Sequence, residues 1–279
     1  MEYSKPFIPL IKEHKKTQPI GVFDSGIGGL TVANAIISHL PQEEIIYFGD
    51  TAHLPYGDKS ADAIRYYSLK IVKFLLEQKC KMIVIACNSA SAAAYKVLLD
   101  FYEGQALFVN VVDPLVEAVA SNNYKKVGII ATKATISSGI YKYKLQEAKP
   151  SLQVESLATP LLAPMIEEGY FNNNISDAVI EKYLSNPIFE NIDALLLACT
   201  HYPLIRKNIE DYFQQKVKVY DSTNVVAHAV RKRLQEFDLL NDEAPKAPKF
   251  FVSDYTPSFA ETTQIFYKEK IELEYCPIW

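Results

Sequence analysis

Two segments of the chain each place a cysteine directly after a run of apolar residues. The first is MIVIACNSAS (82–91), which contains Cys87, and the second is ALLLACTHYP (194–203), which contains Cys199. A strand that ends at the thiol and is followed by a helix puts the sulfur near unpaired backbone amides, which lower its pKa from about 8.5. Position alone fits a reactive thiol and a packed thiol equally well.

Four kinds of chemistry use such residues. A hydrolase needs one nucleophile and one base, which Cys199 and His201 supply while Cys87 stays unused. A zinc site built from these three residues lacks a closely spaced ligand pair, and a redox couple lacks its usual motif around each cysteine. Inversion of a stereocentre needs an acid/base group on each face of one carbon. This last chemistry explains why the thiol occurs twice.

Polar side chains follow the predicted strands at five places. They are Asp24 with Ser25, Asp50 with Thr51, Cys87 with Asn88 and Ser89, Thr132, and Cys199 with Thr200 and His201. Ligands of parallel α/β sheets bind beyond the carboxyl ends of the strands. We therefore expect a small polar ligand in a cleft, held by these hydroxyl groups and by the amides at helix starts.

The segment DSGIGG (24–29) is rich in glycine but matches neither a dinucleotide fingerprint nor a P-loop. A tight strand-to-helix turn and a loop that touches a ligand are equally good interpretations.

Apolar runs alternate with helical patterns along most of the chain, which indicates an α/β protein with parallel sheets. The expected strands are 20–23, 45–49, 82–86, 107–111, 127–131, 153–157, 194–198 and 217–220. Apolar residues at three- and four-residue steps predict a helix in 60–79, with Ser60 as its N-cap. Asn88 and Ser89 suit the N-cap of the helix after Cys87, and Pro203 suits the opening turn after Cys199.

The two halves of the sequence repeat the same layout. Gly21 and Gly128 are 107 residues apart, and Cys87 and Cys199 are 112 apart, in the same order. We expect two pseudo-symmetric α/β domains, each a mostly parallel sheet flanked by helices, with the active site in the cleft between them.

The first expected domain comprises residues 1–112 and 221–279, and the second comprises 113–220. Residues 1–18 read as a polar N-terminal extension. The strand-like FFVSD (250–254) near the C-terminus predicts an added strand in one of the two sheets.

Composition narrows the functional classes. The chain has 279 residues, of which 49% are hydrophobic, and a net charge of −4. This mild negative charge gives no reason to expect binding to nucleic acid or to an anionic membrane. No secretory or membrane-spanning segment is visible. We therefore expect a cytoplasmic protein with reduced thiols, in which Cys80 and Cys276 only fill space.

Six motifs, in order from residue 21 to 223, resemble those of the glutamate racemases. They are GVFDSGIGGLTV, YFGDTAHLPYG, IVIACNSASA, GIIATKATISSGIY, LLLACTHYPLI and DST. The resemblance implies cofactor-independent interconversion of L- and D-glutamate, without a metal. It also implies a homodimer that supplies D-glutamate for peptidoglycan in a bacterial cytoplasm.

The resemblance also implies roles for individual residues. Cys87 is the acid/base for the D-enantiomer and Cys199 for the L-enantiomer. Asp24 and His201 assist the two thiols, respectively, and Asp50 and Glu167 are further catalytic acids. The implied substrate contacts are Asp24, Ser25, Tyr56, Gly57, Asn88, Ser89, Thr132, Thr200 and His201.

Two positions depart from the family pattern. Ser89 stands where threonine is common, which keeps the hydroxyl, and His53 stands where arginine is frequent, which removes a fixed charge near the cleft. A racemase of another small acid, such as aspartate, and an amino-acid binding protein with inert thiols are the alternative functions.

Overall fold

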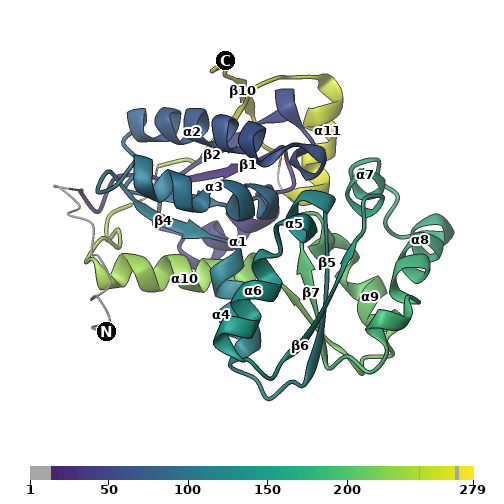
Figure 1. Ribbon diagram of the computed structural model, residues 1–279. Helices are drawn as coiled ribbons and strands as arrows, with labels where there is room; N and C mark the ends of the chain where they lie inside the picture. The colour runs from purple at the N-terminus through teal and green to yellow at the C-terminus, as the bar shows by residue number, and fades with distance from the viewer. Residues whose placement is uncertain (1–13, 245, 268–269) are drawn as a thin grey trace, which may run out of the picture.

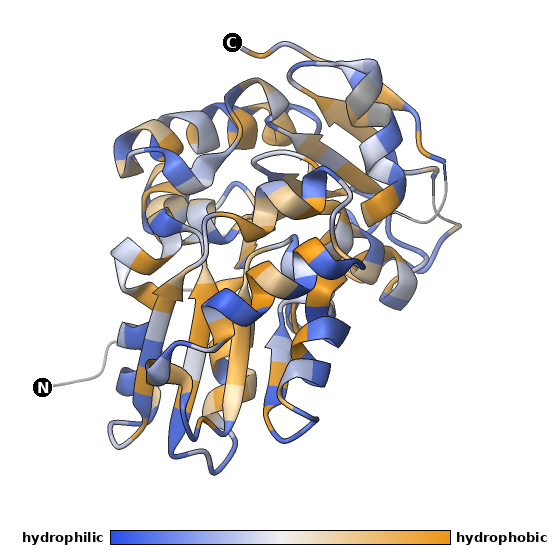
Figure 2. Ribbon diagram, turned by 90° about the vertical axis from the view of Figure 1, so that its right-hand side faces the viewer, coloured by the Kyte–Doolittle hydropathy of each residue, from blue (hydrophilic) through white to orange (hydrophobic). Residues whose placement is uncertain are grey.

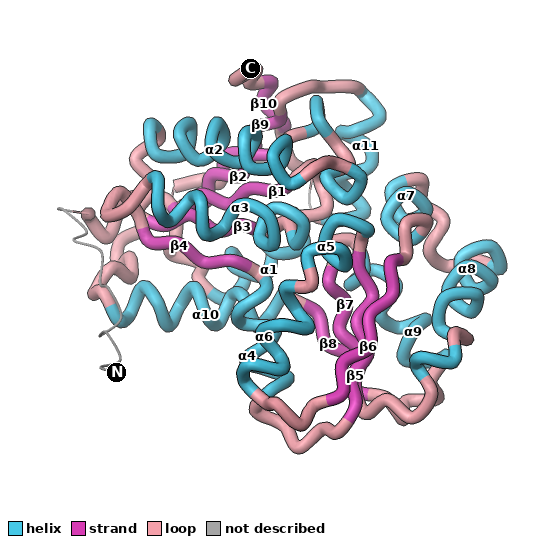
Figure 3. The backbone as a smooth tube through the Cα atoms, viewed as in Figure 1, coloured by secondary structure: helices cyan, strands magenta, loops and turns pink. Residues whose placement is uncertain are grey.

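Two parallel β-sheets form the framework of the protein (Figures 1 and 3). The computed structural model describes residues 14–244, 246–267 and 270–279, so most of the predicted N-terminal extension lies outside the described residues. The first sheet has the strand order β10 (Leu273–Tyr275), β9 (Lys249–Val252), β2 (Ile45–Gly49), β1 (Ile20–Asp24), β3 (Met82–Ile85) and β4 (Leu107–Asn110). The second has the order β6 (Gln153–Ala158), β5 (Lys126–Ala131), β7 (Ala194–Ala198) and β8 (Lys218–Asp221).

The strand predictions are confirmed, each to within one residue at either end. The predicted C-terminal strand is β9, which pairs with β2 in the first sheet. The short strand β10, which pairs with β9, was not predicted from the sequence. The predicted α/β class with two parallel sheets is also confirmed.

The internal repeat of the sequence corresponds to a strand order that the two sheets share. The order β2-β1-β3-β4 in the first sheet corresponds to β6-β5-β7-β8 in the second. Cys87 follows β3 and Cys199 follows β7, which are corresponding strands beside the central β1 and β5. The two thiols therefore leave their sheets at equivalent places, as the offsets in the sequence predict.

Helices cover both faces of each sheet (Figure 1). Around the first sheet lie α1 (Leu30–His39), α2 (Ala61–Glu77), α3 (Asn88–Phe101), α10 (Thr223–Glu236) and α11 (Pro257–Phe266). Around the second lie α4 (Val112–Ala120), α5 (Lys133–Ser138), α6 (Ile140–Ala148), α7 (Leu162–Glu167), α8 (Asn174–Leu184) and α9 (Arg206–Tyr212). Short 3₁₀ turns span Thr51–His53, Tyr56–Asp58, Pro187–Phe189 and Tyr202–Ile205.

The longest helix, α2, shows how the sequence builds these layers. The Ser60 side chain caps it by accepting from the amide of Ala63, as predicted. Ile64, Ile71 and Leu75 form a buried stripe against the sheet, because residues three and four apart share a helix face. Figure 2 shows the same division, with apolar strands inside and mixed helices outside.

The chain passes from the first sheet to the second after β4 and returns after β8. The division into domains 1–112 with 221–279 and 113–220 stays a prediction. Among the described helices, none has the length and apolar character needed to cross a membrane.

Candidate active site

A cavity of about 250 Å³ lies between the two halves of the protein, at the carboxyl ends of the strands. The first half lines it with Ser25, Gly26, Leu54, Pro55, Tyr56, Gly57, Cys87, Asn88 and Ser89. The second half lines it with Thr132, Ala163, Pro164, Glu167, Cys199, Thr200 and His201. Both thiols therefore face the same cavity.

Cys87 is itself the N-cap of α3. Its sulfur accepts the amide of Ala90 at 3.4 Å and lies 3.7 Å from Ser25 Oγ. The prediction that Asn88 or Ser89 caps this helix is wrong, since both lie within it. The predicted lowering of the thiol pKa is wrong as well. Burial and the charge of Asp24 raise the pKa of Cys87, because the desolvation of a thiolate outweighs the helix amide.

Asp24 ends β1 and is completely buried beneath the cavity, outside its lining. Its Oδ2 accepts the amide of Gly29 at 2.9 Å, and its Oδ1 has no hydrogen-bond partner among the described residues. Burial raises the pKa of Asp24, against the charge of His201 and the amides of Gly29 and Ser25. Asp24 is thus a buried carboxyl group close to Cys87, with a pKa above its usual range.

Cys199 belongs to a second acid/base chain. Its Sγ lies 3.6 Å from Nδ1 of His201, whose Nε2 lies 2.7 Å from Oε1 of Glu167. Burial alone lowers the pKa of His201, but the contacts with Cys199 and Glu167 outweigh it and raise this pKa well above 6.5. The imidazolium form of His201 is therefore favoured between the thiol and the carboxylate.

The predicted place of Pro203 in the opening turn after Cys199 is confirmed. Pro203 lies in the 3₁₀ turn Tyr202–Ile205, and the α-helix α9 begins only at Arg206. The thiol therefore lies beside a single tight turn, and the groups that act on it are side chains rather than a long helix.

The glycine-rich loop brings the two halves into contact. A Cβ added at Gly28 would lie 2.4 Å from His201 Cε1, so only glycine leaves room for the imidazole. On the adjacent turn of α1, Thr31 Oγ1 donates to the carbonyl of Thr200 at 3.0 Å. Ser25 and Gly26 line the cavity, whereas Gly28 and Gly29 do not. Both interpretations of this loop are therefore partly right.

Glu167 provides a test of the Cys199 chain. Because the carboxylate helps to raise the pKa of His201, Glu167→Gln is expected to move the alkaline limb of kcat/KM to lower pH. Loss of a hydrogen bond to a charged group is expected to lower activity near neutral pH about 10- to 100-fold. The measurement is a pH–rate profile, with Glu168→Gln as the control because Glu168 is an exposed neighbour.

The raised pKa of His201 also makes the stability of the fold depend on pH. Because the pKa of His201 is higher in the folded protein than in the unfolded chain, protonated His201 contributes stability below pH 6.5. This contribution is lost as the pH rises through the folded pKa. Glu167→Gln should reduce that contribution. An unchanged profile would show that Glu167 does not act on His201.

Asn88 and Ser89, at the start of α3, present polar side chains to the cavity. Asn88 Oδ1 accepts the hydroxyl of Tyr141 at 2.6 Å, which leaves its Nδ2 buried without a partner among the described residues. Ser89 Oγ lies 2.9 Å from Thr132 Oγ1 and 3.2 Å from Thr135 Oγ1. A buried donor without a partner favours an acceptor such as a carboxylate.

Sequence reasoning missed Tyr141 and Thr135. Both lie in GIIATKATISSGIY, which was recognised as a motif, but nothing in its pattern distinguishes these residues from packed ones. Both join the halves through side-chain contacts with residues of α3.

Asp50 does not line the cavity, although it was predicted as a catalytic acid. It is completely buried and accepts the hydroxyls of Tyr56 at 2.6 Å and Ser253 at 2.7 Å. Tyr56 does line the cavity, next to Gly57, which fits closely against Thr132. Asp50 is therefore placed to hold Tyr56 rather than to touch a ligand.

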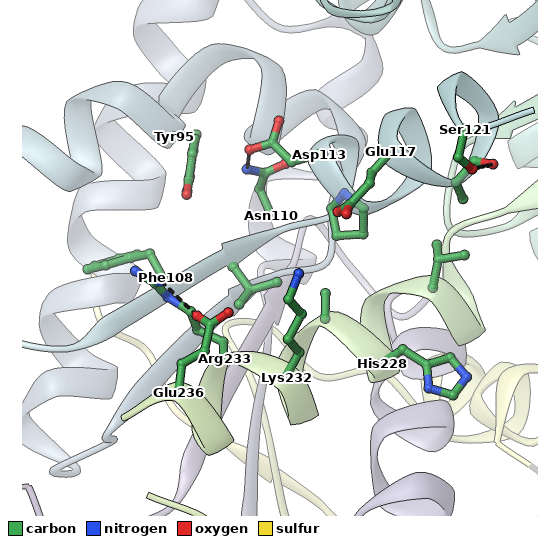
Figure 4. Close-up of a pocket in the computed structure, with 15 residues that line it drawn as sticks. Tyr95, Phe108, Asn110, Asp113, Glu117, Ser121, His228, Lys232, Arg233 and Glu236 are labelled. Carbon is green, nitrogen blue, oxygen red and sulfur yellow. Dashed lines mark hydrogen bonds and ion pairs between the residues drawn. The ribbon is translucent and has the colours of Figure 1, made fainter. Parts of the chain in front are cut away.

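A larger hollow of about 650 Å³ lies between α3, β4, α4 and α10 (Figure 4). Its walls carry both signs of charge, from Asp113 and Glu117 of α4 and from Lys232 and Arg233 of α10. It contains no cysteine and none of the predicted site residues. Among the described residues, no group of three His, Cys, Asp or Glu side chains is arranged to hold a metal. The smaller cavity is the candidate active site because both thiols line it.

Fold and site together define a two-sheet α/β protein with a thiol from each half at a shared ligand cavity. The family model for Asp/Glu/hydantoin racemases matches residues 30–230, and the chain belongs to this family. The glutamate racemase of Chlorobaculum parvum is 38% identical over 260 residues, which cover 92% of this chain and 95% of that protein.

Solved structures of similar proteins support the same family assignment. The glutamate racemase of Francisella tularensis subsp. tularensis, in complex with D-glutamate, matches with a TM-score of 0.89 and 37% identity, over 94% of this chain and 98% of that one. Isoform RacE1 of the glutamate racemase of Bacillus anthracis matches with a TM-score of 0.89 and 32% identity, over 94% and 99%.

Proposed function

We propose that the protein interconverts L- and D-glutamate without a cofactor, using Cys87 and Cys199 as the two acid/base groups. The observation that carries the proposal is that equivalent strands of two matched sheets deliver one thiol each to the same cavity. The similarity to a glutamate racemase whose structure contains D-glutamate supports glutamate as the substrate.

The reaction balances within the pair of thiols. From L-glutamate, the Cys199 thiolate takes the α-proton, so that the α C–H bond breaks and an S–H bond forms. Cys87 then gives its own proton to the opposite face of the carbanion and becomes the thiolate. The net change is inversion, and no electrons are lost or gained.

The neighbours of each thiol suit these starting forms. The imidazolium of His201 stabilises a thiolate at Cys199, while burial and Asp24 keep Cys87 protonated. In the reverse direction the protonated and ionised forms exchange. The free Asn88 Nδ2 and the amides at the start of α3 are placed to hold a substrate carboxylate and the charge that develops on it.

The biological role follows from the same resemblance. We propose a homodimer in a bacterial cytoplasm that supplies D-glutamate for peptidoglycan. The partner is a small-molecule substrate, and the charge of the chain supports neither nucleic acid nor a membrane as a partner.

Incubation of L-glutamate with the purified protein in heavy water tests the function. Chiral analysis should show D-glutamate carrying deuterium at the α-carbon, without added cofactor. Faster turnover of aspartate in the same assay would indicate the alternative substrate. Glutamate binding without α-proton exchange would indicate a binding protein with inert thiols and would contradict the proposal.

A further inference from the structure

The C-terminal segment contacts residues that neighbour the wall of the cavity, although it does not line the cavity itself. Strand β10 pairs with β9, and the amide of Cys276 donates to the carbonyl of Val252 at 2.9 Å. The segment ends with Trp279, the only tryptophan of the chain. Its ring packs edge-on against His53, with centroids 4.4 Å apart, and against Tyr67 at 5.3 Å.

His53 is held on three sides. Its ring stacks on Tyr67, with centroids 4.1 Å apart and planes inclined by 22°. The Trp279 ring packs against it in a T-shaped contact, with planes inclined by 80°. Its Nδ1 lies 2.9 Å from Oδ1 of Asp50. The planar imidazole makes all three contacts together.

Asp50 connects His53 with Tyr56, a residue of the cavity wall. The same carboxylate accepts the hydroxyl of Tyr56 at 2.6 Å, and Tyr56 lines the cavity. Ser253, just after β9, donates to Asp50 at 2.7 Å and accepts the amide of Ala52 at 3.0 Å. The C-terminal strands therefore contact Asp50 directly through Ser253 and indirectly through Trp279 and His53.

We propose that Trp279 is a positioning residue, which acts through His53 and Asp50 to hold Tyr56 in the place that substrate binding requires. Neither Trp279 nor His53 lines the cavity, so any effect of Trp279 on binding is indirect. Besides the path through His53 and Asp50, the ring of Tyr67 makes a second contact between Trp279 and Tyr56, because its centroid lies 5.3 Å from that of Trp279 and 5.7 Å from that of Tyr56. The proposal rests on the proposed function, since Tyr56 is taken as a wall of the glutamate site.

Steady-state kinetics give the first test. Loss of an aromatic pair is expected to raise KM for both enantiomers about 3- to 10-fold in Trp279→Ala, with a smaller change in kcat. Trp279→Phe should restore most of the affinity, because a ring remains against His53. The matched control is Tyr275→Ala, which removes an exposed aromatic side chain from the adjoining strand. An unchanged KM in Trp279→Ala, or an equal rise in Tyr275→Ala, would overturn the proposal.

The single tryptophan also reports on the contact directly. Titration with D-glutamate should change the emission of Trp279 in the wild-type protein. Tyr56→Phe removes the hydroxyl that binds Asp50, so the same titration, at concentrations that saturate this variant, should change the emission much less. Emission that responds equally in both proteins would show that the signal does not pass through Tyr56.

A double-mutant cycle separates this inference from the proposed function. In the ligand-free protein, the shifts in urea midpoint caused by Trp279→Ala and Tyr56→Phe should be non-additive, because the two residues share the Asp50 network. Additive shifts would overturn the positioning role even if the wild type racemises glutamate. Failure of the wild type to racemise glutamate, with non-additive shifts, would instead contradict the proposed function alone.

Discussion

Cys199→Ala and Cys87→Ala are each expected to lower kcat/KM for racemisation by at least about 10²- to 10⁴-fold, the usual contribution of one positioned acid/base group. The loss must be equal in the two directions, because enantiomers have the same free energy in water. Unequal losses of kcat/KM would indicate an assay fault rather than a property of the site. Chiral chromatography of both directions measures the effect.

Hydrogen exchange then distinguishes the two thiols. In heavy water, a variant that retains one thiol can still exchange the α-proton of the enantiomer that presents this proton to it. The family resemblance assigns Cys87 to D-glutamate, so Cys199→Ala should exchange deuterium into D-glutamate and Cys87→Ala into L-glutamate. Exchange into the same enantiomer by both variants would place the sulfurs on one face of the substrate and contradict the mechanism.

Cys80 supplies the matched control for this experiment. It is a buried free thiol in the core of the first half, away from the cavity. Cys80→Ala should keep wild-type racemisation, since no step uses it. A comparable loss in this variant would show that removal of any buried thiol disturbs the fold.

Lys81→Met is expected to destabilise the protein by about 3–5 kcal/mol, because it leaves a buried carboxylate without its partner. Lys81 is completely buried, and its Nζ lies 2.6 Å from Oε2 of Glu43. It also donates to the carbonyls of Leu239, at 2.8 Å, and Lys16. This one ammonium therefore joins the segment before β1, the loop before β2 and the end of the α10 region.

Urea unfolding measures this loss of unfolding free energy. The midpoints are compared at an unchanged m-value, which is the slope of that free energy against urea concentration. Lys81→Met combined with Glu43→Leu should recover part of the stability, since no unpaired charge remains. Recovery is incomplete because Glu43 also accepts the amide of Asn241 at 2.8 Å. Lys73→Met, which breaks only an exposed pair with Glu77, should cost less than about 1 kcal/mol.

Activity separates the structural role of Lys81 from a catalytic one. Lys81 precedes β3, and Cys87 follows the other end of that strand. Well below its melting temperature, Lys81→Met should therefore keep near-wild-type kcat and KM. Unchanged stability, or a double variant no more stable than the single one, would contradict the prediction that the buried Lys81–Glu43 ion pair stabilises the fold.

The sequence by itself indicated every described strand except β10 and identified the two equivalent thiols. Short runs of apolar residues that alternate with helical patterns indicate central parallel strands, and the carboxyl ends of such strands meet at one edge. Cys87 and Cys199 were recognisable because each follows such a run. Their shared cavity follows from the repeat of one topology in two sheets.

Only the tertiary structure decided how the site residues work. The pKa of Cys87 is raised rather than lowered, because burial and Asp24 outweigh the start of a helix. Asp50 lies behind Tyr56, and Tyr141 reaches Asn88 from the other half. The physical reason is that desolvation and side-chain contacts depend on residues distant in the chain, whereas strand patterns depend on neighbours.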